Sequence, residues 1–170
     1  KEGTRAEDIL VTGIPVRQQF LDADCRQKRE RNRTRRVLIM GGGLGLMPDL
    51  KELLEKLHSM QGVESVVITG KNHKMYEEWV NRYEDVEVLG YTENISRYMR
   101  GADLVITKAG GITLFEILHS QVPLFVIHPF LEQEMNNARY AAEKGFAKEA
   151  ITKFTQFLEK NDFSLDSLKD

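Results

Sequence analysis

The segment TKAGGITLFE, from Thr107 to Glu116, carries residue types and spacing suited to binding a phosphate. It follows an apolar run typical of a buried strand and opens an apolar-periodic helix. Gly110 and Gly111 allow the backbone to come close to a ligand, and the unpaired N–H groups at the start of the helix attract an anion. We expect Glu116 about one turn inside that helix, where its carboxylate can accept hydrogen bonds from sugar hydroxyls.

Glycines also follow two other predicted strands. The run GGGLG, from Gly41 to Gly45, follows one strand, and Gly70 follows the next strand along the chain. Because the carboxyl ends of the strands in a doubly wound sheet face one crevice, we expect these glycines to line one rim together with Gly110 and Gly111. Turn geometry alone is an alternative reason for each glycine taken singly.

Two familiar phosphate-binding fingerprints do not match the sequence. The dinucleotide pattern G-x-G-x-x-G fails because Leu46 or Pro48 occupies the third glycine position, counted from Gly41 or Gly43. The strand that follows ends at Thr69 without a carboxylate to hold a ribose. The sequence contains no Gly-Lys-Ser or Gly-Lys-Thr triplet of a Walker-type loop and no G-x-S-x-G nucleophile elbow. Phosphate binding by backbone amides and a helix dipole is the interpretation that these patterns leave.

Two carboxylate patterns have competing interpretations. Thr113 and Glu116 have the spacing of a capping box, so Glu116 can instead cap its own helix. Asp22 and Asp24 have the spacing that some sugar-nucleotide transferases use to hold a metal, but a charge run follows them. The four histidines are scattered without ligand spacing, and the single cysteine, Cys25, excludes a Cys-based zinc site. We therefore expect neither a metal nor another cofactor.

Short apolar runs alternate with amphipathic stretches, which predicts an α/β fold with a doubly wound, Rossmann-like parallel sheet. With 170 residues, 41% of them hydrophobic and 29% charged, the chain is long enough for a single domain with a sizeable core. The predicted strands are Ile9 to Thr12, Val37 to Met40, Ser65 to Thr69, Val86 to Leu89, Asp103 to Thr107 and Leu124 to His128.

Helices are predicted where apolar residues recur at three- and four-residue spacing. The clearest runs from Leu50 to Leu57, with Asp49 as its N-cap and Glu52 completing a capping box. The others are a helix through Met75, Trp79 and Tyr83, a short turn at Ile95 to Arg100, and helices at Ile112 to Ser120, Glu134 to Lys144 and Glu149 to Lys160.

The overall charge gives no attraction to nucleic acid, because the net charge is −2 and the pI is near 6.1. One segment, Arg26 to Arg36, is nevertheless strongly basic, with seven Lys or Arg in eleven residues. It suits either a solvated linker or contact with anionic lipid head groups, and it lacks the aromatic residues that stack on bases. A single cysteine and the lack of an apolar run of membrane-spanning length favour a cytoplasmic setting.

Five motifs occur in a characteristic order. They are GIPVR at Gly13 to Arg17, the Gly41 to Gly45 loop, GYTENI at Gly90 to Ile95, KAGGITLFE at Lys108 to Glu116, and VPL through EQEMNNA at Val122 to Ala138. In this order they resemble the C-terminal, donor-binding domain of GT-B glycosyltransferases of the monogalactosyldiacylglycerol synthase and processive diacylglycerol glucosyltransferase family. The same half is similar to the peptidoglycan UDP-GlcNAc transferase.

The resemblance implies a UDP-sugar site in which backbone N–H groups hold the pyrophosphate. Gly110, Gly111 and Ile112 would contribute those amides, and Glu116 would hold the ribose hydroxyls. The full set of residues that would bind UDP is Gly43, Gly45, Tyr91, Thr92, Gly110, Gly111, Ile112, Thr113 and Glu116.

The same resemblance implies the rest of the reaction. Tyr91 and Thr92 would border the uracil, and Gln133 and Glu134 would hydrogen-bond the donor sugar. The family inverts the anomeric carbon without an obligatory metal and transfers a hexose to a lipid acceptor such as diacylglycerol at the inner face of the cell membrane. Its N-terminal half would supply the acceptor site and the general base. That half is not among the 170 residues, so no catalytic residue is assigned and we expect donor binding without transfer by this chain alone.

Two alternatives share the donor-binding interpretation. One is a nucleotide-sugar-binding subunit that docks onto a separate acceptor-binding membrane protein, and the other is half of a sugar-nucleotide epimerase. Gln133 and Glu134 do not distinguish glucose, galactose and N-acetylglucosamine. A short connection at Gly145 to Ala147 departs from the family pattern.

Overall fold

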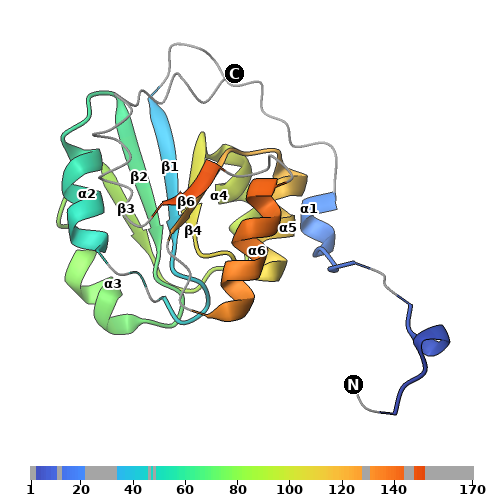
Figure 1. Ribbon diagram of the computed structural model, residues 1–170. Helices are drawn as coiled ribbons and strands as arrows, with labels where there is room; N and C mark the ends of the chain where they lie inside the picture. The colour runs from blue at the N-terminus through green and yellow to red at the C-terminus, as the bar shows by residue number, and fades with distance from the viewer. Residues whose placement is uncertain are drawn as a thin grey trace.

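Six parallel strands form one sheet in the part of the chain that the structure describes, in the order β3-β2-β1-β4-β5-β6 (Figure 1). The computed structural model describes residues 3–10, 13–21, 34–45, 47, 49–127, 131–143 and, for the backbone, 148–151. The predicted doubly wound α/β sheet is therefore confirmed, with β1 beside β4 where the strand order reverses. The strands are β1 (Arg35–Met40), β2 (Val63–Ile68), β3 (Val86–Leu89), β4 (Leu104–Thr107), β5 (Leu124–Ile127) and β6 (Lys148–Ile151).

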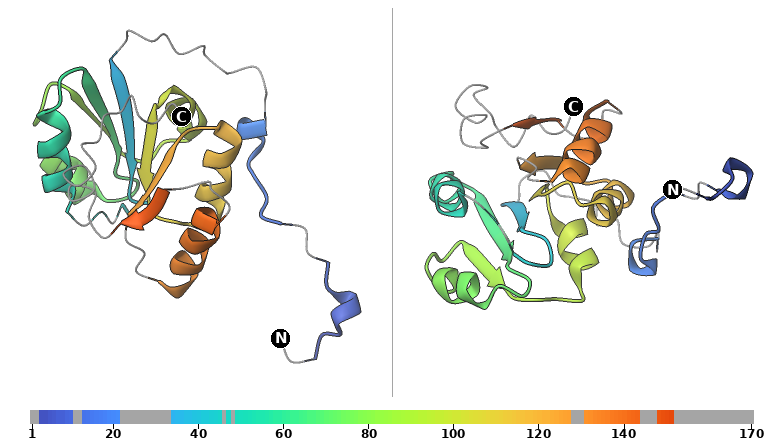
Figure 2. Two further views of the ribbon diagram at one scale, coloured as in Figure 1. Left: turned by 45° about the horizontal axis from the view of Figure 1, so that its top comes forward. Right: turned by 60° about the horizontal axis from the view of Figure 1, so that its bottom comes forward.

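Helices cover both faces of the sheet (Figures 1 and 2). α2 and α3 pack on one face, and α1, α4, α5 and α6 pack on the other. Their bounds are α1 (Gln18–Leu21), α2 (Leu50–His58), α3 (His73–Trp79), α4 (Ile95–Gly101), α5 (Gly111–Ser120) and α6 (Glu132–Glu143), after a short 3-10 turn, η1 (Ala6–Asp8).

The sequence of β1 accounts for its place between two helical layers. Leu38 and Met40 point to the face of α4 and α5, and Val37 and Ile39 point to the face of α2. All four side chains are at most 5% exposed. Because successive side chains of a strand point to opposite faces, an apolar run without polar alternation is stable only where both faces are covered.

α2 is amphipathic, as its leucine spacing predicts. Leu50, Leu53, Leu54 and Leu57 are all at most 5% exposed and belong to the core on the β1 and β2 side. Asp49 occupies the predicted N-cap position, but the capping hydrogen bond expected there is missing, because its side chain makes none. Its backbone is left-handed, with φ of 58°, a conformation that Asp tolerates better than most residues. Asp49 therefore turns the chain into α2 without capping it.

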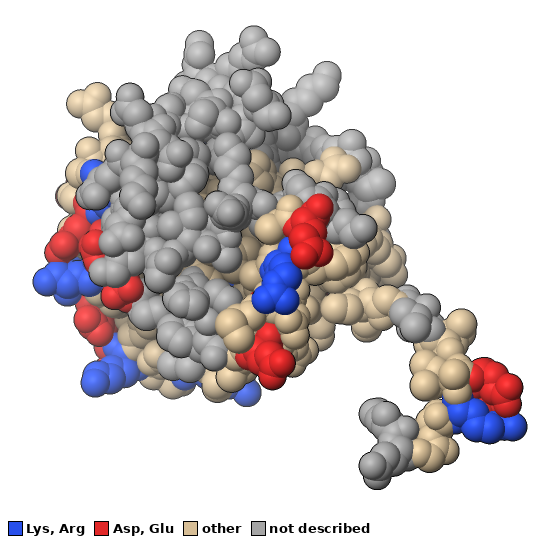
Figure 3. All heavy atoms as spheres, viewed as in Figure 1, with Lys and Arg blue, Asp and Glu red and all other residues tan. Residues whose placement is uncertain are grey.

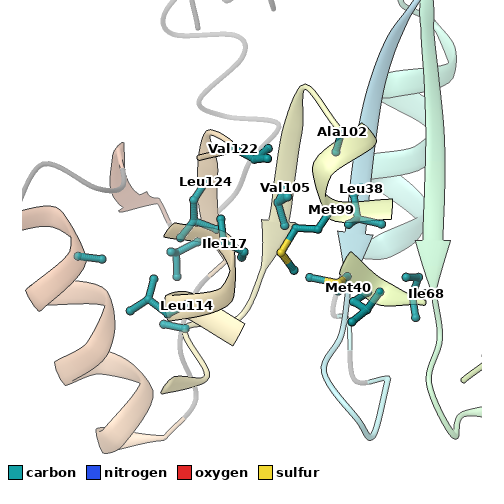
Figure 4. Packing of buried hydrophobic residues seen from close by; sticks show 14 of the residues in the cluster. Leu38, Met40, Ile68, Met99, Ala102, Val105, Leu114, Ile117, Val122 and Leu124 are labelled. Carbon is teal, nitrogen blue, oxygen red and sulfur yellow. The ribbon is translucent and has the colours of Figure 1, made fainter. Parts of the chain in front are cut away.

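The opposite core positions α5, which carries the predicted phosphate turn (Figure 4). Met99 of α4 and Leu114 and Ile117 of α5 are at most 2% exposed in this cluster. α6 contributes the small side chains Ala138 and Ala141, at most 4% exposed, which let the helix backbone come close to its neighbours. The start of α5 is thus held relative to both the sheet and α6.

The strand predicted at Ile9 to Thr12 is wrong over its described half. Ile9 and Leu10 lie outside any strand, 57% and 85% exposed. Val11 and Thr12 are outside the described residues. The segment leads away from the body of the protein (Figures 1 and 2), so it meets no sheet edge that could supply the hydrogen bonds of a strand.

The helix predicted at Glu149 to Lys160 is also wrong at its start. Residues up to Ile151 form β6, which pairs in parallel with β5 from Phe125 to Ile127. Residues 152–160 lie outside the described part of the chain. The spacing of the apolar residues favours a helix here. The segment forms a strand instead, because the backbone N–H and C=O groups at the edge of β5 need a partner strand.

Smaller differences concern two helices. The segment predicted as a short turn is the helix α4, in which Ile95 and Met99 are buried. α3 ends at Trp79, so Tyr83 lies beyond it, with its ring centroid 4.6 Å from that of His58.

Candidate functional site

A cavity of about 660 Å³ opens at the carboxyl ends of β1 and β4, the crevice that the strand order predicts. The two strand ends are tied together because the Thr107 hydroxyl donates to the Met40 carbonyl at 2.9 Å. The described residues that line the cavity are Gly41, Gly42, Gly43, Leu44, Gly45, Met47, Asn72, Met75, Thr107, Lys108, Gly110, Thr113, Leu131 and Glu134.

The glycine loop after β1 interlocks with the end of β2. Gly45 has φ of +60°, and a Cβ atom there would lie 2.0 Å from the Thr69 carbonyl oxygen. Gly70 has φ of +59°, and its Cβ would lie 2.8 Å from the Gly43 carbonyl oxygen, which also accepts from the Lys71 amide at 3.2 Å. Only glycine fits such positions without backbone movement. The expected single rim is thus confirmed for the Gly41 to Gly45 loop and Gly70 only, because Gly110 lines the cavity from the facing side.

Asn72 strengthens the same interlock, although it was not among the site residues predicted from the sequence. Its Oδ1 accepts from the Met75 amide at 3.0 Å and caps α3, while its Nδ2 donates to the Gly45 carbonyl at 3.3 Å. An Asn just before a helical stretch is a recognised N-cap signal, so this residue could have been found from the sequence.

The facing rim is the start of α5. The Leu114 amide donates to the Gly110 carbonyl at 2.9 Å, the first bond of the helix. The amides of Gly111, Ile112 and Thr113 therefore precede the intrahelical ladder and have no acceptor within it. Of these three residues, Thr113 lines the cavity, whereas Gly111 and Ile112 are not among its lining residues. The Gly110 amide differs, because it donates to the Lys108 carbonyl at 2.9 Å. Gly110 thus contributes to the rim through its missing side chain, with its amide already engaged.

A smaller cavity of about 150 Å³ adjoins the first, and Gly42, Gly43, Thr107 and Thr113 line both. Tyr91 and Thr92, the two residues expected to border the uracil, both line this smaller cavity. Tyr91 is 66% exposed. The other described residues of its wall are Arg17, Met40, Ile68, Gly70 and Ile95.

Glu116 is 1% exposed and is held by Arg17. Arg17 Nε donates to one carboxylate oxygen at 2.6 Å, and Arg17 Nη2 donates to the other at 3.0 Å. The hydrogen bond to Glu116 raises the pKa of Arg17 above the ordinary arginine value. The capping alternative for Glu116 is wrong, because α5 begins at Gly111 with no side-chain cap and places Thr113 inside the helix.

Arg17 is a second site residue, after Asn72, that was not predicted from the sequence. It stands at the end of the GIPVR motif, but nothing in the motif indicates which residue it contacts across 99 positions of sequence. The segment that carries it docks firmly on the domain. Phe20 is 4% exposed in the core, Ser96 donates to the Gln19 side chain at 3.0 Å, and Arg100 donates to the Gln19 carbonyl.

The two residues predicted for the donor sugar are neighbours on α6, but only one of them lines a cavity. Glu134 lines the larger cavity with Lys108 and Gly110. Gln133 is exposed and lines neither of the two cavities described above. Adjacent helical positions differ by about 100° in direction, so both cannot face one cavity equally.

The remaining charged patterns are only partly described. Asp22 and Asp24 lie outside the described residues, as do positions 26–33 of the basic segment. Arg35 lies 3.8 Å from the Asp103 carboxylate, and Arg36 lies 2.7 Å from the Glu64 carboxylate, so these two cations already have acidic partners. On the face shown in Figure 3, basic and acidic side chains are interspersed over the α2 and α3 side.

The described residues contain neither a membrane-spanning helix nor a metal-binding cluster. No helix among them is long and apolar enough to cross a membrane. No group of three or more His, Cys, Asp or Glu side chains within the same ranges is placed to hold a metal ion.

Comparison with known proteins agrees with the motif resemblance. A processive diacylglycerol beta-glucosyltransferase of Bacillus cereus is 34% identical over 189 aligned residues, covering 99% of this chain and 47% of that protein. The enzyme of the same name from Bacillus licheniformis is 36% identical over 158 residues, covering 85% of this chain and 40% of that protein. The chain thus spans about half the length of the curated relatives it matches.

The fold is shared with solved structures. Acinetobacter baumannii MurG superposes with a TM-score of 0.61 at 20% identity, covering 84% of this chain and 47% of that chain. Residues 36–153, which include β2 to β6, all of β1 but its first residue, α5 and the described rims of the larger cavity, match the glycosyltransferase family 28 C-terminal domain. The chain therefore belongs to the glycosyltransferase family 28 C-terminal domain family.

Proposed function

We propose that this chain binds the UDP-sugar donor of an inverting glycosyltransferase that transfers a hexose to a lipid acceptor such as diacylglycerol. The observation that carries the proposal is the start of α5, where Gly110 and Thr113 line a cavity faced by a glycine loop and the amides of Gly111, Ile112 and Thr113 have no intrahelical acceptor. Helix N-termini of this kind attract phosphates through their amides and their dipole. A volume of about 660 Å³ is of the size that small-molecule ligands occupy.

In this proposal the diphosphate lies between the two rims. The amides of α5 hold it from one side, and Gly43 and Gly45 allow the backbone to approach from the other. As the sugar is transferred, negative charge develops on the departing UDP. Fixed amide dipoles stabilise that charge without reorganising, so no metal is required for this step.

The nucleoside occupies the smaller cavity, with the uracil beside Tyr91 and Thr92. The ribose hydroxyls bind Glu116, whose two oxygens now accept from Arg17. Because Glu116 is 1% exposed, the ribose reaches it only when the guanidinium moves aside. The Arg17 side chain is 49% exposed and has room to do so.

The donor sugar lies toward Glu134, with Gln133 at the outer edge. The acceptor site and the general base belong to residues outside this chain. We place the whole enzyme at the cytoplasmic face of the membrane, where the segment from Arg26 to Arg36 would add contact with anionic lipids. Alone, this chain binds donor and transfers nothing.

Calorimetric titration of the 170-residue chain with UDP, UDP-glucose, UDP-galactose, UDP-N-acetylglucosamine and NADH tests the proposal. We expect UDP and at least one UDP-sugar to bind with affinity that EDTA does not change, and NADH not to bind. A chain that binds none of the uridine nucleotides would refute the proposal, and NADH binding would favour an epimerase. Turnover of UDP-sugar with diacylglycerol vesicles by this chain alone would contradict the need for a second half.

A further inference from the structure

Asn137, which is half-buried on α6, ties that helix to the turn before α5. Its Nδ2 atom donates to the Ala109 carbonyl oxygen at 2.8 Å. Ala109 is 1% exposed, so water does not replace this bond easily. One turn earlier on the same helix, Glu134 lines the larger cavity. A single helix therefore reaches both the cavity wall and the turn.

Both polar atoms of the peptide between Ala109 and Gly110 are held. Asn137 binds its carbonyl oxygen, and the Lys108 carbonyl accepts its N–H at 2.9 Å. This peptide leads into Gly110, the residue before the first residue of α5, so fixing its plane limits the directions that the following amides can take. The Asn137 amide also packs beside Gly111, because a Cβ at that position would lie in ordinary van der Waals contact with Asn137 Nδ2, at 3.7 Å.

We infer that Asn137 is a positioning residue for the phosphate turn, which it holds so that the amides of Gly111 and Ile112 face the cavity. The inference rests on the proposed function. It also gives α6 a double role, since the helix that carries Glu134 at the sugar end is bound to the turn at the diphosphate end. Sugar and diphosphate would thus be placed by one connected unit.

NMR titrations with uridine and with UDP test the inference, because the ratio of the two affinities isolates the phosphate contribution. Asn137→Asp keeps the shape of the side chain but removes the donor, and Asn137→Ala removes the tether. We expect both variants to weaken UDP binding about tenfold while uridine binding changes less than about twofold. Asn136→Ala, at the exposed neighbouring position, is the matched control and keeps the wild-type ratio.

An unchanged ratio in folded Asn137 variants would overturn the inference while leaving the proposed function intact. Failure of the wild-type chain to bind UDP would instead overturn both.

If neither variant folds, the amide spectrum of the wild-type chain tests the inference. On addition of UDP, the Gly111 and Ile112 amide resonances should shift strongly and the Gly110 resonance should shift little, because its N–H stays on Lys108. A Gly110 shift as large as that of Gly111 would mean that the peptide is not held, and would contradict the inference.

Discussion

The two rims of the larger cavity are held together by different means. On the β1 and β2 side, Gly45 and Gly70 place backbone against backbone, with no space for a Cβ atom at either position. On the α5 side, the positions are held by side chains, Arg17 on Glu116 and Asn137 on Ala109. Backbone in close contact cannot adjust without moving whole strands, whereas side chains change rotamer at small cost. The first rim is therefore rigid, and the second can respond to a ligand.

The largest effect is expected on the rigid rim, from Gly45→Ala. The new Cβ would lie 2.0 Å from the Thr69 carbonyl oxygen at a φ of +60°, so strand ends must separate. We expect the free energy of unfolding to fall by about 3 kcal/mol or more, measured by urea denaturation.

Gly43→Ala is the matched control on the same loop. A Cβ atom at Gly43 would have no heavy atom within 4 Å, and the φ of Gly43 is not positive. The free energy of unfolding of this variant should therefore stay within about 1 kcal/mol of the wild-type value. Similar losses in the two variants would show that the interlock does not hold this rim.

An intermediate effect is expected at the adjustable rim, from Glu116→Gln. The substitution keeps the shape but removes one of the two acceptors of Arg17, so we expect stability to fall by about 1–2 kcal/mol. If Glu116 holds the ribose, the affinity for UDP falls about tenfold while that for 2′,3′-dideoxy-UDP does not change. Equal losses for the two nucleotides by calorimetry would argue against a ribose contact.

A smaller effect is expected from Gly111→Ala, the counterpart of Gly45→Ala on the opposite rim. Its Cβ would lie 3.1 Å from Ile14 Cδ1, the far end of a flexible side chain. Ala also favours a helix over Gly by about 0.5–1 kcal/mol, which offsets the crowding. The unfolding midpoint should therefore change little. A loss as large as that of Gly45→Ala would remove the distinction between the rims.

The smallest effect concerns pH. The pKa of Arg17 is raised in the folded protein, so its stabilisation is fully present below the pKa of the unfolded state and is lost only as pH rises through the folded value. Both lie far above neutrality. The difference in melting temperature between the wild type and Arg17→Ala should therefore be constant from about pH 6 to 9. A difference that varies across this window would show that another titrating group controls the rim.

Local patterns predicted much of the fold because the causes are local. An apolar run such as that of β1 is stable only where other elements cover both faces of the strand. The leucine spacing of α2 places all four leucines on one face of the helix, which is the face that is buried. The glycine clusters pointed to the carboxyl ends of strands for the same kind of reason. Patterns failed where a partner far along the chain decides the outcome, as at Ile9, which meets no sheet, and at Ile151, which pairs with β5.

The sequence by itself determined the class of fold, the glycine turn before α5 and the family, because each depends on residue types and spacing within short segments. Only the tertiary structure decided what holds that turn and its carboxylate. Arg17 meets Glu116, and Asn137 meets Ala109, through contacts that span 99 and 28 positions. Such pairs leave no periodic signal, since they depend on how packed layers bring distant segments within hydrogen-bonding distance.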